Sequence, residues 1–254
     1  MKRKFKLLTI MALSAFMLTL ASCSEEVPGD TTPVDTTENT EPTCYLTTCE
    51  DAGSRTFEYN ATNQLIKATI EADVINYTYV DNKLSVAEDN NGNKSTFTFD
   101  GGDIPSRIDI VENGENAGYI LLESTEGNIT RIENHDASGT ATLLAVVEYE
   151  ENNPVSLSYQ QWDEASKQFQ TALEVENIET DGKNNPYRGD FALMFTNLNS
   201  PFIFGQSNIL SGTVKILGND TPITGTHEYN EKDFPTSSNL ASGVYSATYT
   251  YDCK

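Results

Sequence analysis

The sequence has few positive charges, and this shortage excludes a class of partner. Its 254 residues include 16 Lys and Arg against 38 Asp and Glu, which gives a formal net charge of -22 at pH 7. A chain this acidic is repelled by nucleic acid phosphates, and its basic residues form no run that would offset the repulsion. We therefore expect no nucleic acid among its partners.

Histidine and the usual catalytic motifs are also scarce. The two histidines, His135 and His227, lie in polar, turn-like contexts, and their spacing does not place two ligands on one helical face. The stretch from Asp89 to Asn93 lacks the alternating carboxylates of a calcium loop and predicts a hairpin turn instead. No Gly-x-Ser-x-Gly elbow is present, and among 38 acids a chance carboxylate pair identifies no glycosidase. We expect no metal, no cofactor and no catalytic residue.

The N-terminal apolar run is short. It extends over about 14 residues from Leu7 to Leu20, whereas a helix needs roughly 20 residues to cross a hydrocarbon core of about 30 Å. Four basic residues precede it and small residues follow it, which is the pattern of a secretory signal. We expect residues 1–22 to be removed, which takes away four positive charges and leaves a net charge of -26.

The end of this signal, Leu20-Ala21-Ser22-Cys23, resembles the lipobox of bacterial lipoproteins, in which the cysteine becomes the new N-terminus and carries the lipid. The alternative is an ordinary secretory signal with a chance cysteine. The next residues, Ser24-Glu25-Glu26, are similar to the acidic signal that sends Bacteroidetes lipoproteins to the outer face of the outer membrane. The resemblance implies lipid attachment at Cys23, an outer-membrane location and a domain that faces the cell surface.

Residues 23–42 are rich in Thr, Pro and acids and have no apolar period, so we expect an extended, solvated tether. Within it, Thr31 and Thr36 each follow an Asp. These pairs are similar to the Asp-Thr motif of O-glycosylation in exported Bacteroidetes proteins, although so many Thr also produce chance matches. Residues 43–254 are long enough for one domain with a sizeable core.

Three cysteines remain beyond the lipidated one. An oxidising envelope compartment favours one disulfide among Cys44, Cys49 and Cys253. Because Cys253 is in the last expected strand and the other two are in the first, the bridge would join the two ends of the domain. A metal site at Cys44 and Cys49 is the alternative, but no histidine is nearby to complete it.

A recurring pattern of alternating aromatic residues predicts β-hairpins. Tyr59, Tyr79 and Phe99 are spaced 20 residues apart, which fits two strands of about seven residues with two short turns. Each aromatic strand is followed by Asn, Asp or Gly, which tolerate the left-handed conformations of tight turns. A sheet of roughly a dozen such strands must curl or close. We expect an all-β antiparallel meander that forms a curled sheet or a barrel-like domain, with the aromatics as cross-strand packing.

The units "FEYNATNQL" and "YTYVDNKL" and the terminal "YTYDCK" are similar to the tyrosine-aspartate repeats of large bacterial surface proteins. With the lipoprotein signal and the acidic tether, they resemble a Bacteroidetes lipoprotein family of unknown function whose domains are described as porin-like. The resemblance covers most of residues 43–254 and implies a fold but no activity. We do not expect a membrane-spanning barrel, because the strands lack a continuous lipid-facing apolar band with aromatic girdles.

The periodicity fails between Asp181 and Gly212, where the mature chain has its densest apolar cluster. We expect a plug that fills the open side of the sheet, with a short helix from Asp190 to Asn197. The alternative is a hydrophobic ligand cavity or partner surface. The apolar residues of this segment are Phe191, Leu193, Met194, Phe195, Phe202, Ile203 and Phe204.

The candidate ligand-binding residues are Tyr159, Trp162, Tyr187 and Phe191. Trp162 lies between Gln and Asp residues and could stack on a sugar, although a single Trp beside Tyr159 is more often a packing residue. We expect binding around Trp162 and from Pro186 to Gly205, where the repeat fails. The functional prediction is a non-enzymatic binding module for a glycan, a peptide or an envelope protein. The alternatives are a structural or adhesin-like protein without a small ligand, and a polysaccharide hydrolase.

Overall fold

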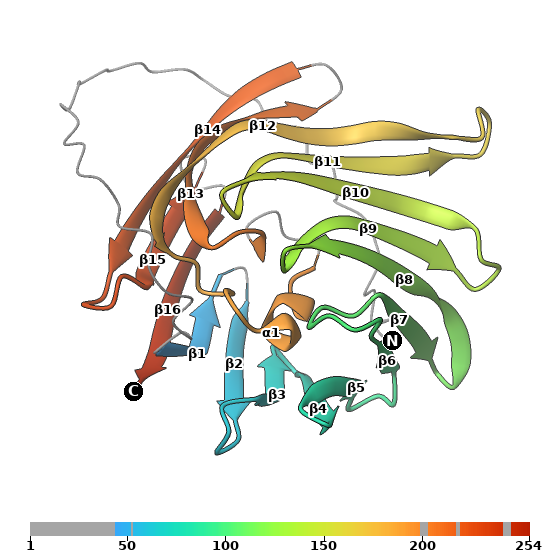
Figure 1. Cartoon of the computed structure of the whole chain (residues 1–254), viewed down its shortest axis with the longest axis horizontal. Helices are drawn as coiled ribbons and strands as arrows, with labels where there is room; N and C mark the ends of the chain where they lie inside the picture. The colour runs from blue at the N-terminus through green and yellow to red at the C-terminus, as the bar shows by residue number, and fades with distance from the viewer. Residues whose placement is uncertain (1–43, 52, 199–202, 217–218, 241–244) are drawn as a thin grey trace. The chain divides into compact units, whose positions relative to one another are not determined.

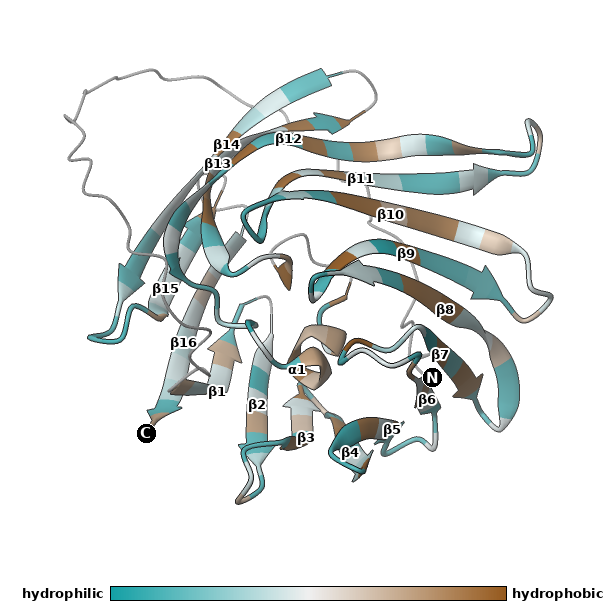
Figure 2. Cartoon of the chain, viewed as in Figure 1, coloured by the Kyte–Doolittle hydropathy of each residue, from teal (hydrophilic) through white to brown (hydrophobic). Residues whose placement is uncertain are grey.

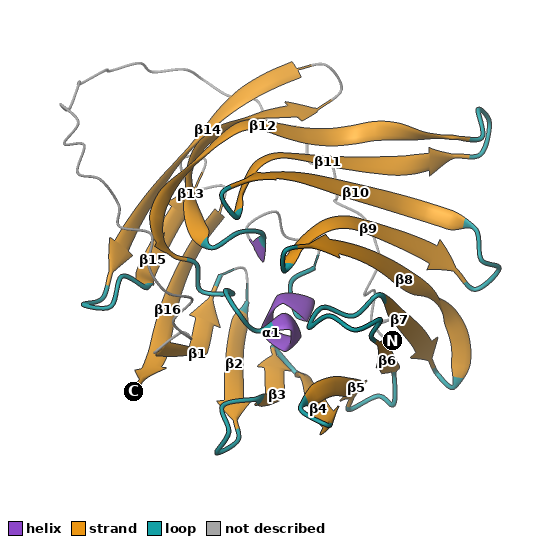
Figure 3. Ribbon diagram, in the orientation of Figure 1, coloured by secondary structure: helices purple, strands orange, loops and turns teal. Residues whose placement is uncertain are grey.

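The structure, a computed structural model, describes residues 44–51, 53–198, 203–216, 219–240 and 245–254. Within these ranges the chain forms sixteen strands and one α-helix of five residues; Figure 3 shows how strands dominate the fold. The first eight strands are β1 (Cys44–Glu50), β2 (Ser54–Tyr59), β3 (Leu65–Ile70), β4 (Asp73–Val80), β5 (Lys83–Asp89), β6 (Lys94–Thr98), β7 (Arg107–Glu112) and β8 (Glu115–Thr125). The other elements are β9 (Asn128–Asp136), β10 (Ala141–Glu150), β11 (Asn153–Asp163), β12 (Gln168–Asn184), α1 (Phe191–Phe195), β13 (Ser207–Ile216), β14 (Asn219–Tyr229), β15 (Pro235–Leu240) and β16 (Tyr245–Cys253).

The sheet is a closed barrel. Each strand pairs antiparallel with the next strand in the chain, and β1 pairs with β16 to complete the ring (Figure 1). Closure leaves no unpaired edge, which is how an up-and-down meander of this size avoids edge-to-edge aggregation. The predicted all-β hairpin meander is confirmed, in its barrel form. The barrel has more strands than the expected dozen because segments without the aromatic motif, including β12 and β13, also form long strands.

Alternation along the strands separates a mainly apolar interior from a mainly polar outer wall. In β4, Ile75 and Tyr77 are buried while Asn76 and Thr78 are exposed. The same period of two recurs in β6, where buried residues alternate with exposed Lys and Thr. Figure 2 shows the resulting mixture of hydrophilic and hydrophobic positions along each strand. Among the described residues, the large hydrophobic side chains that are exposed are Ile66, Val80 and Leu210.

The hairpin turns explain the placement of Asn, Asp and Gly. Between β4 and β5, Asp81 and Asn82 have φ of 51° and 63°, so both central residues are left-handed. A two-residue turn of this kind matches the right-handed twist of the flanking strands. The turn predicted from Asp89 to Asn93 is confirmed between β5 and β6, where the Asp89 carboxylate accepts the amides of Asn91 and Asn93 at 2.8 and 2.9 Å.

Both histidines lie in strands, so the prediction that they are turn residues is wrong. His135 is in β9, and its ring stacks on Tyr119 with centroids 4.4 Å apart. His227 is in β14, where its two ring nitrogens lie 2.8 Å from Ser238 Oγ and 2.9 Å from the Ile209 carbonyl. His135 has an outward strand position, which is as polar as a turn, whereas His227 follows the inward phase of β14 and lies against the buried Ser238.

A disulfide joins the first and last strands. Cys44 of β1 is bonded to Cys253 of β16, and these residues are also register partners in the sheet. Cys49 remains a buried free thiol, and its burial raises the pKa to about 11. Of the pairings that the sequence left open, this one links residues 209 apart in the chain. Within the described ranges, no helix has the length and hydropathy needed to cross a membrane.

The irregular segment between β12 and β13 lies inside the ring of strands, where α1 is visible near β2 and β3 (Figure 1). The structure describes its residues 185–198 and 203–206, which we call the mouth segment. The helix is shorter than the predicted Asp190 to Asn197 because Asp190 is its N-cap and Thr196 its C-cap. As predicted, the segment partly plugs the barrel; Phe202 lies outside the described residues.

Candidate functional site

A cavity of about 490 Å³ opens at one end of the barrel, between the hairpin turns and the mouth segment. We call this end the barrel mouth; it carries the turns β2–β3, β4–β5 and β14–β15 and the loop β6–β7. The volume falls within the range of about 300–1,000 Å³ typical of small-molecule sites. The hairpins contribute Tyr45, Tyr59, Thr62, Asn63, Gln64, Tyr79, Asn82, Lys83, Leu84, Phe99, Asp103 and Phe234 to the wall, and the mouth segment contributes Pro186, Arg188, Gly189, Asp190, Phe191, Ala192 and Leu193.

The hairpin tyrosines at the mouth have a recurring structural role. The Tyr79 hydroxyl donates to the Leu65 carbonyl at 2.9 Å, which links its hairpin to the preceding one. Tyr149 donates to the Ile129 carbonyl at 2.9 Å in the same way. At each of these tyrosines the strand register shifts by one residue. Tyrosine therefore recurs because its ring packs while its hydroxyl satisfies a backbone acceptor.

Tyr59 departs from this pattern. Its hydroxyl makes no hydrogen bond within the described part of the chain, and its ring lies 5.5 Å from that of Tyr45 in a tilted arrangement. Both tyrosines line the cavity. Lys254 Nζ lies 5.3 Å from the centre of the Tyr45 ring and donates to Asn63 Oδ1 at 2.6 Å. The wall beside β1 thus combines two aromatic faces with a hydroxyl that is available to a ligand.

Asp190 shapes the opposite wall. Its carboxylate Oδ1 accepts the amides of Ala192 and Leu193 at 2.9 and 3.2 Å, so it caps the first turn of α1. This cap directs the helix inwards, where Phe195 meets Phe97 edge to face with the ring centroids 5.0 Å apart. Phe191, also in edge-to-face contact with Phe97 at 6.1 Å, lines the cavity.

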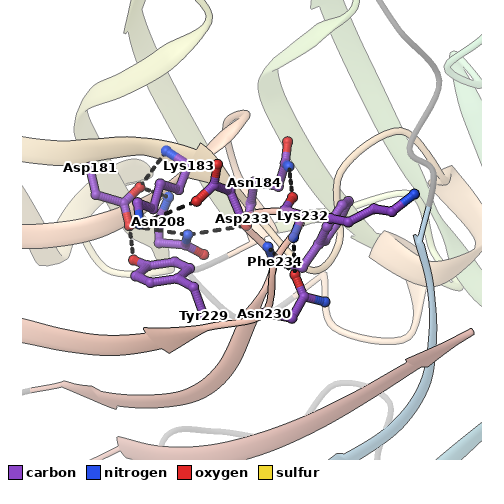
Figure 4. Close-up of polar contacts among 9 residues, drawn as sticks. All are labelled: Asp181, Lys183, Asn184, Asn208, Tyr229, Asn230, Lys232, Asp233 and Phe234. Carbon is purple, nitrogen blue, oxygen red and sulfur yellow. Dashed lines mark hydrogen bonds and ion pairs between the residues drawn. The ribbon is translucent and has the colours of Figure 1, made fainter. Parts of the chain in front are cut away.

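A polar network fixes the start of the mouth segment (Figure 4). The Asp181 carboxylate accepts the Asn208 amide and side chain at 3.1 and 3.2 Å, and it also accepts the Tyr229 hydroxyl. Lys183 Nζ lies 4.0 Å from the centre of the Tyr229 ring and 3.3 Å from the Asp233 carboxylate. These hydrogen bonds hold the Asp181 side chain firmly in place, because hydrogen bonds to a charged group are stronger than those between neutral groups. The network joins the end of β12 to β13 and β14.

The same network reaches the β14–β15 turn and then the cavity. Asn184 Nδ2 donates to the Lys232 carbonyl at 2.9 Å, and the Asn184 amide donates to the Asp233 carbonyl at 3.0 Å. Arg188 Nη1 donates to Asn184 Oδ1 at 2.7 Å. Since Arg188 and Phe234 line the cavity, the network sets the position of that part of its wall.

The end of the mouth segment is held by close packing against β11. Gly205 has φ of +93°, and a Cβ at this position would lie 2.4 Å from Pro154 Cδ. The Ser207 amide donates to Asn153 Oδ1 at 3.0 Å. The buried Phe204 lies beside this glycine in sequence and is 1% exposed. Only glycine fits here, because the backbone conformation and the contact both exclude a side chain.

Burial raises the pKa of several groups around the cavity. The pKa of Asp190 is raised by desolvation, which outweighs the two backbone hydrogen bonds that stabilise the carboxylate. The pKa values of Tyr59, Tyr77 and Tyr79 are raised first by burial and then by the negative charge of Asp190. The carboxylate therefore lies close enough to all three tyrosines to affect their ionisation.

The structure brings together only some of the residues that the sequence suggested for binding. Phe191 lines the cavity. Tyr187 does not; it is 2% exposed, and its hydroxyl lies 3.7 Å from Cys49 Sγ. Tyr159 is buried in β11, and its hydroxyl has no hydrogen-bond partner among the described residues. Trp162 is near the opposite end of β11, where it packs edge to face on Phe169 at 5.3 Å and donates to Glu164. Tyr159 and Trp162 do not line the cavity.

Sequence reasoning missed the contribution of the regular hairpins. The expectation that binding lies where the repeat fails stays a prediction, but Tyr45, Tyr59 and Tyr79, which lie outside the irregular segment, also form much of the cavity wall. Asp190 was predicted as the start of a helix but not as a residue of the cavity wall. Cys23, Thr31 and Thr36 lie outside the described residues. Within the described ranges, no group of three or more His, Cys, Asp or Glu side chains is arranged to hold a metal ion.

The sequence matches no protein-family model and no curated protein. The fold is similar to that of a porin-like protein from Bacteroides uniformis, with a TM-score of 0.54 and 15% identity over 82% of this chain and 95% of that one. It is also similar to a porin-like protein from Bacteroides vulgatus, with a TM-score of 0.57 and 10% identity over 82% of this chain and 99% of that one. The fold is thus an all-β, porin-like closed barrel.

Proposed function

We propose that this protein is a non-enzymatic, lipid-anchored outer-membrane protein whose barrel mouth binds a glycan or a peptide. In this proposal it belongs to the Bacteroidetes family of porin-like lipoproteins that its motifs resemble. The observation that carries the binding function is the cavity at the mouth, with its aromatic walls and its amide and carboxylate side chains. Such a combination offers flat faces for stacking and directional partners for orientation.

The lipid anchor and the cell-surface orientation rest on the sequence. Cys23 ends a lipobox-like motif, and the acidic residues that follow resemble a surface-export signal. Porin-like structures from two Bacteroides species share the fold, which supports an envelope protein. In the proposal, the barrel stands in water on its tether. The mostly polar outer wall supports this, because the lipid-facing wall of a membrane barrel is apolar.

Two measurements test the location. In metabolic labelling with palmitate, the wild type should incorporate the label and the Cys23→Ala variant should not. Protease treatment of intact cells should then digest the barrel domain. If the wild type takes up no label, the lipid anchor is wrong. If the barrel domain resists the protease, it lies on the periplasmic side of the outer membrane.

The binding function is tested with the full-length lipoprotein in detergent on glycan and peptide arrays. Tyr59→Ala and Phe191→Ala should abolish the signal of any bound ligand, because both side chains line the cavity. Trp162→Ala is the matched control, since it removes an aromatic residue far from the mouth and should leave binding unchanged. If no ligand binds, or if Trp162→Ala is the variant that loses binding, the cavity is not the functional site.

A further inference from the structure

The cavity contains a carboxylate that its surroundings only partly satisfy. Both amides that cap onto Asp190 bind Oδ1, so Oδ2 receives no donor from the described residues. The side chain is partly accessible from the cavity and otherwise surrounded by protein. Desolvation disfavours a carboxylate that has no opposite charge nearby, and it raises the pKa of Asp190.

The cations of the cavity are engaged elsewhere. Lys83 Nζ donates to the Gly102 carbonyl at 2.7 Å and lies 5.2 Å from the centre of the Phe99 ring. Arg188 donates to Asn184. Neither forms an ion pair within the described part of the chain, and no cation contributes to the pKa of Asp190. The negative charge of Asp190 is therefore left for a ligand to compensate.

The aromatic surroundings suit a positively charged group. Tyr59, Tyr79 and Phe191 line the cavity together with Asp190, and aromatic faces attract ammonium groups through their negative quadrupoles. The Tyr59 hydroxyl has no partner among the described residues and can accept a further hydrogen bond. A carboxylate with several aromatic faces is a general arrangement for recognising amines.

The shape of the cavity favours a sugar over a lysine side chain. A lysine is a thin, flexible chain that would leave most of the aromatic wall of the cavity uncovered. A sugar ring presents an apolar face for stacking and several hydroxyls for hydrogen bonding. The cavity is broad enough for more than one such ring, at about 490 Å³.

We propose that the ligand of the barrel mouth is a glycan with a free amino sugar, whose ammonium group binds Asp190 between Tyr59, Tyr79 and Phe191. This inference rests on the proposed function and names the ligand class of the same site. The competing explanation is that Asp190 serves only as the N-cap of α1. Asn is an equally good N-cap, so Asp190→Asn removes the charge and keeps the cap.

Isothermal titration of the full-length lipoprotein separates these explanations. The probes are the fully deacetylated and the fully N-acetylated trimer of glucosamine, which differ in the charge of the amine. A pH of about 6.5 favours the protonated amine, since a peptide α-amino group, which like the sugar amine has electron-withdrawing neighbours, titrates at about 7.7–8.0. The wild type should bind the deacetylated trimer at least about tenfold more tightly, which corresponds to about 1.4 kcal/mol. Asp190→Asn should remove this preference, and Asp220→Asn, an exposed carboxylate at the other end of β14, should retain it.

A second probe pair separates the sources of the amine. It consists of a capped tripeptide with a central lysine and the same peptide with acetylated lysine. The proposal is overturned if the two sugars bind equally, or if Asp190→Asn still prefers the deacetylated sugar. It is also overturned if only the peptide pair shows a preference for the free amine that depends on Asp190. Failure of all four probes to bind also overturns it. In each of these cases the proposed binding function still stands if a ligand found on the arrays binds the wild type and no longer binds Tyr59→Ala.

Discussion

The hairpins from β2 to β7 and the mouth segment both contribute aromatic residues to the same cavity, yet they are held in place by different means. In the hairpins, short turns and alternating burial fix each side chain through neighbours that are close in sequence. The mouth segment has one helix of five residues and depends on contacts with β2, β6 and β11. Just before it, Asn184 at the end of β12 binds the β14–β15 turn. Local pairing thus builds the barrel, and contacts between distant parts of the chain shape its mouth.

The largest expected effect comes from Gly205→Ala. The substitution strains a left-handed backbone and overlaps Pro154, so we expect a loss of about 3 kcal/mol in the free energy of unfolding. Gly92→Ala in the β5–β6 turn is the matched change in the hairpins, with φ of +82° and open space around the new Cβ. Gly92→Ala should lower the free energy of unfolding by about 1–2 kcal/mol, because it strains only the left-handed backbone. Urea unfolding of both variants measures the difference, and equal losses would contradict the close packing of the segment.

Next in size is the loss of one hydroxyl, either from the polar network beside the mouth segment or from a hairpin. Tyr229→Phe removes a hydrogen bond to the Asp181 carboxylate and should cost about 1.5–3 kcal/mol, because the acceptor is charged. Tyr79→Phe removes a bond to the Leu65 carbonyl and should cost about 0.5–1.5 kcal/mol. Amide exchange should also speed up at Lys183 and Asn208 in Tyr229→Phe alone. A larger loss in Tyr79→Phe would show that the hairpin bonds are the stronger ones.

A double-mutant cycle measures the coupling between the two regions. Phe97 belongs to β6 and Phe195 to α1, and their edge-to-face contact predicts a coupling energy of about 0.5–1.5 kcal/mol when both are changed to Leu. Phe97→Leu combined with Phe169→Leu is the control, because Phe169 packs on Trp162 instead. The control pair should be additive within about 0.5 kcal/mol. If the changes in unfolding free energy are additive in both cycles, the contact between Phe97 and Phe195 does not stabilise the packing of α1 on the hairpins.

The smallest effect is expected from Asp190→Asn in the absence of ligand. Because burial raises the folded-state pKa of Asp190, the folded protein holds this proton more strongly than the unfolded chain does. Its contribution to stability is therefore greatest in acid and is lost as the pH rises through the folded-state pKa. Asp190→Asn should be slightly more stable than the wild type near pH 7, and the difference should vanish below the ordinary value of 3.8. Melting temperatures across this range test the sign, and a less stable variant at pH 7 would contradict it.

The hairpins were predictable because their signals are local. Tyr59, Tyr79 and the Asn and Asp residues after them specify strands and turns within a few positions of one another. The start of α1 could also be read, since Asp190 is a recognisable cap before an apolar run. The histidines were misjudged because the polar neighbours of His135 fit an outward strand position as well as a turn.

The cavity could not be predicted in the same way. Tyr59 and Phe191 are far apart in the sequence, and they share a wall only because β1 closes on β16 and the mouth segment folds inside the ring. Tyr159 and Trp162 are three residues apart in sequence, but Tyr159 is buried in the core and Trp162 lies near the opposite end of the barrel. Nothing local in the sequence carries that information.

The sequence by itself determined the acidic charge, the hairpins and their turns, since these depend on composition and on neighbours within one unit. The tertiary structure decided that the meander closes, that Cys44 rather than Cys49 pairs with Cys253, and that Asp190 lies among tyrosines at the mouth with no ion pair to the described residues. The physical reason is closure. Joining the first strand to the last sets which distant residues meet, and only then do ordinary packing residues become the wall of a site.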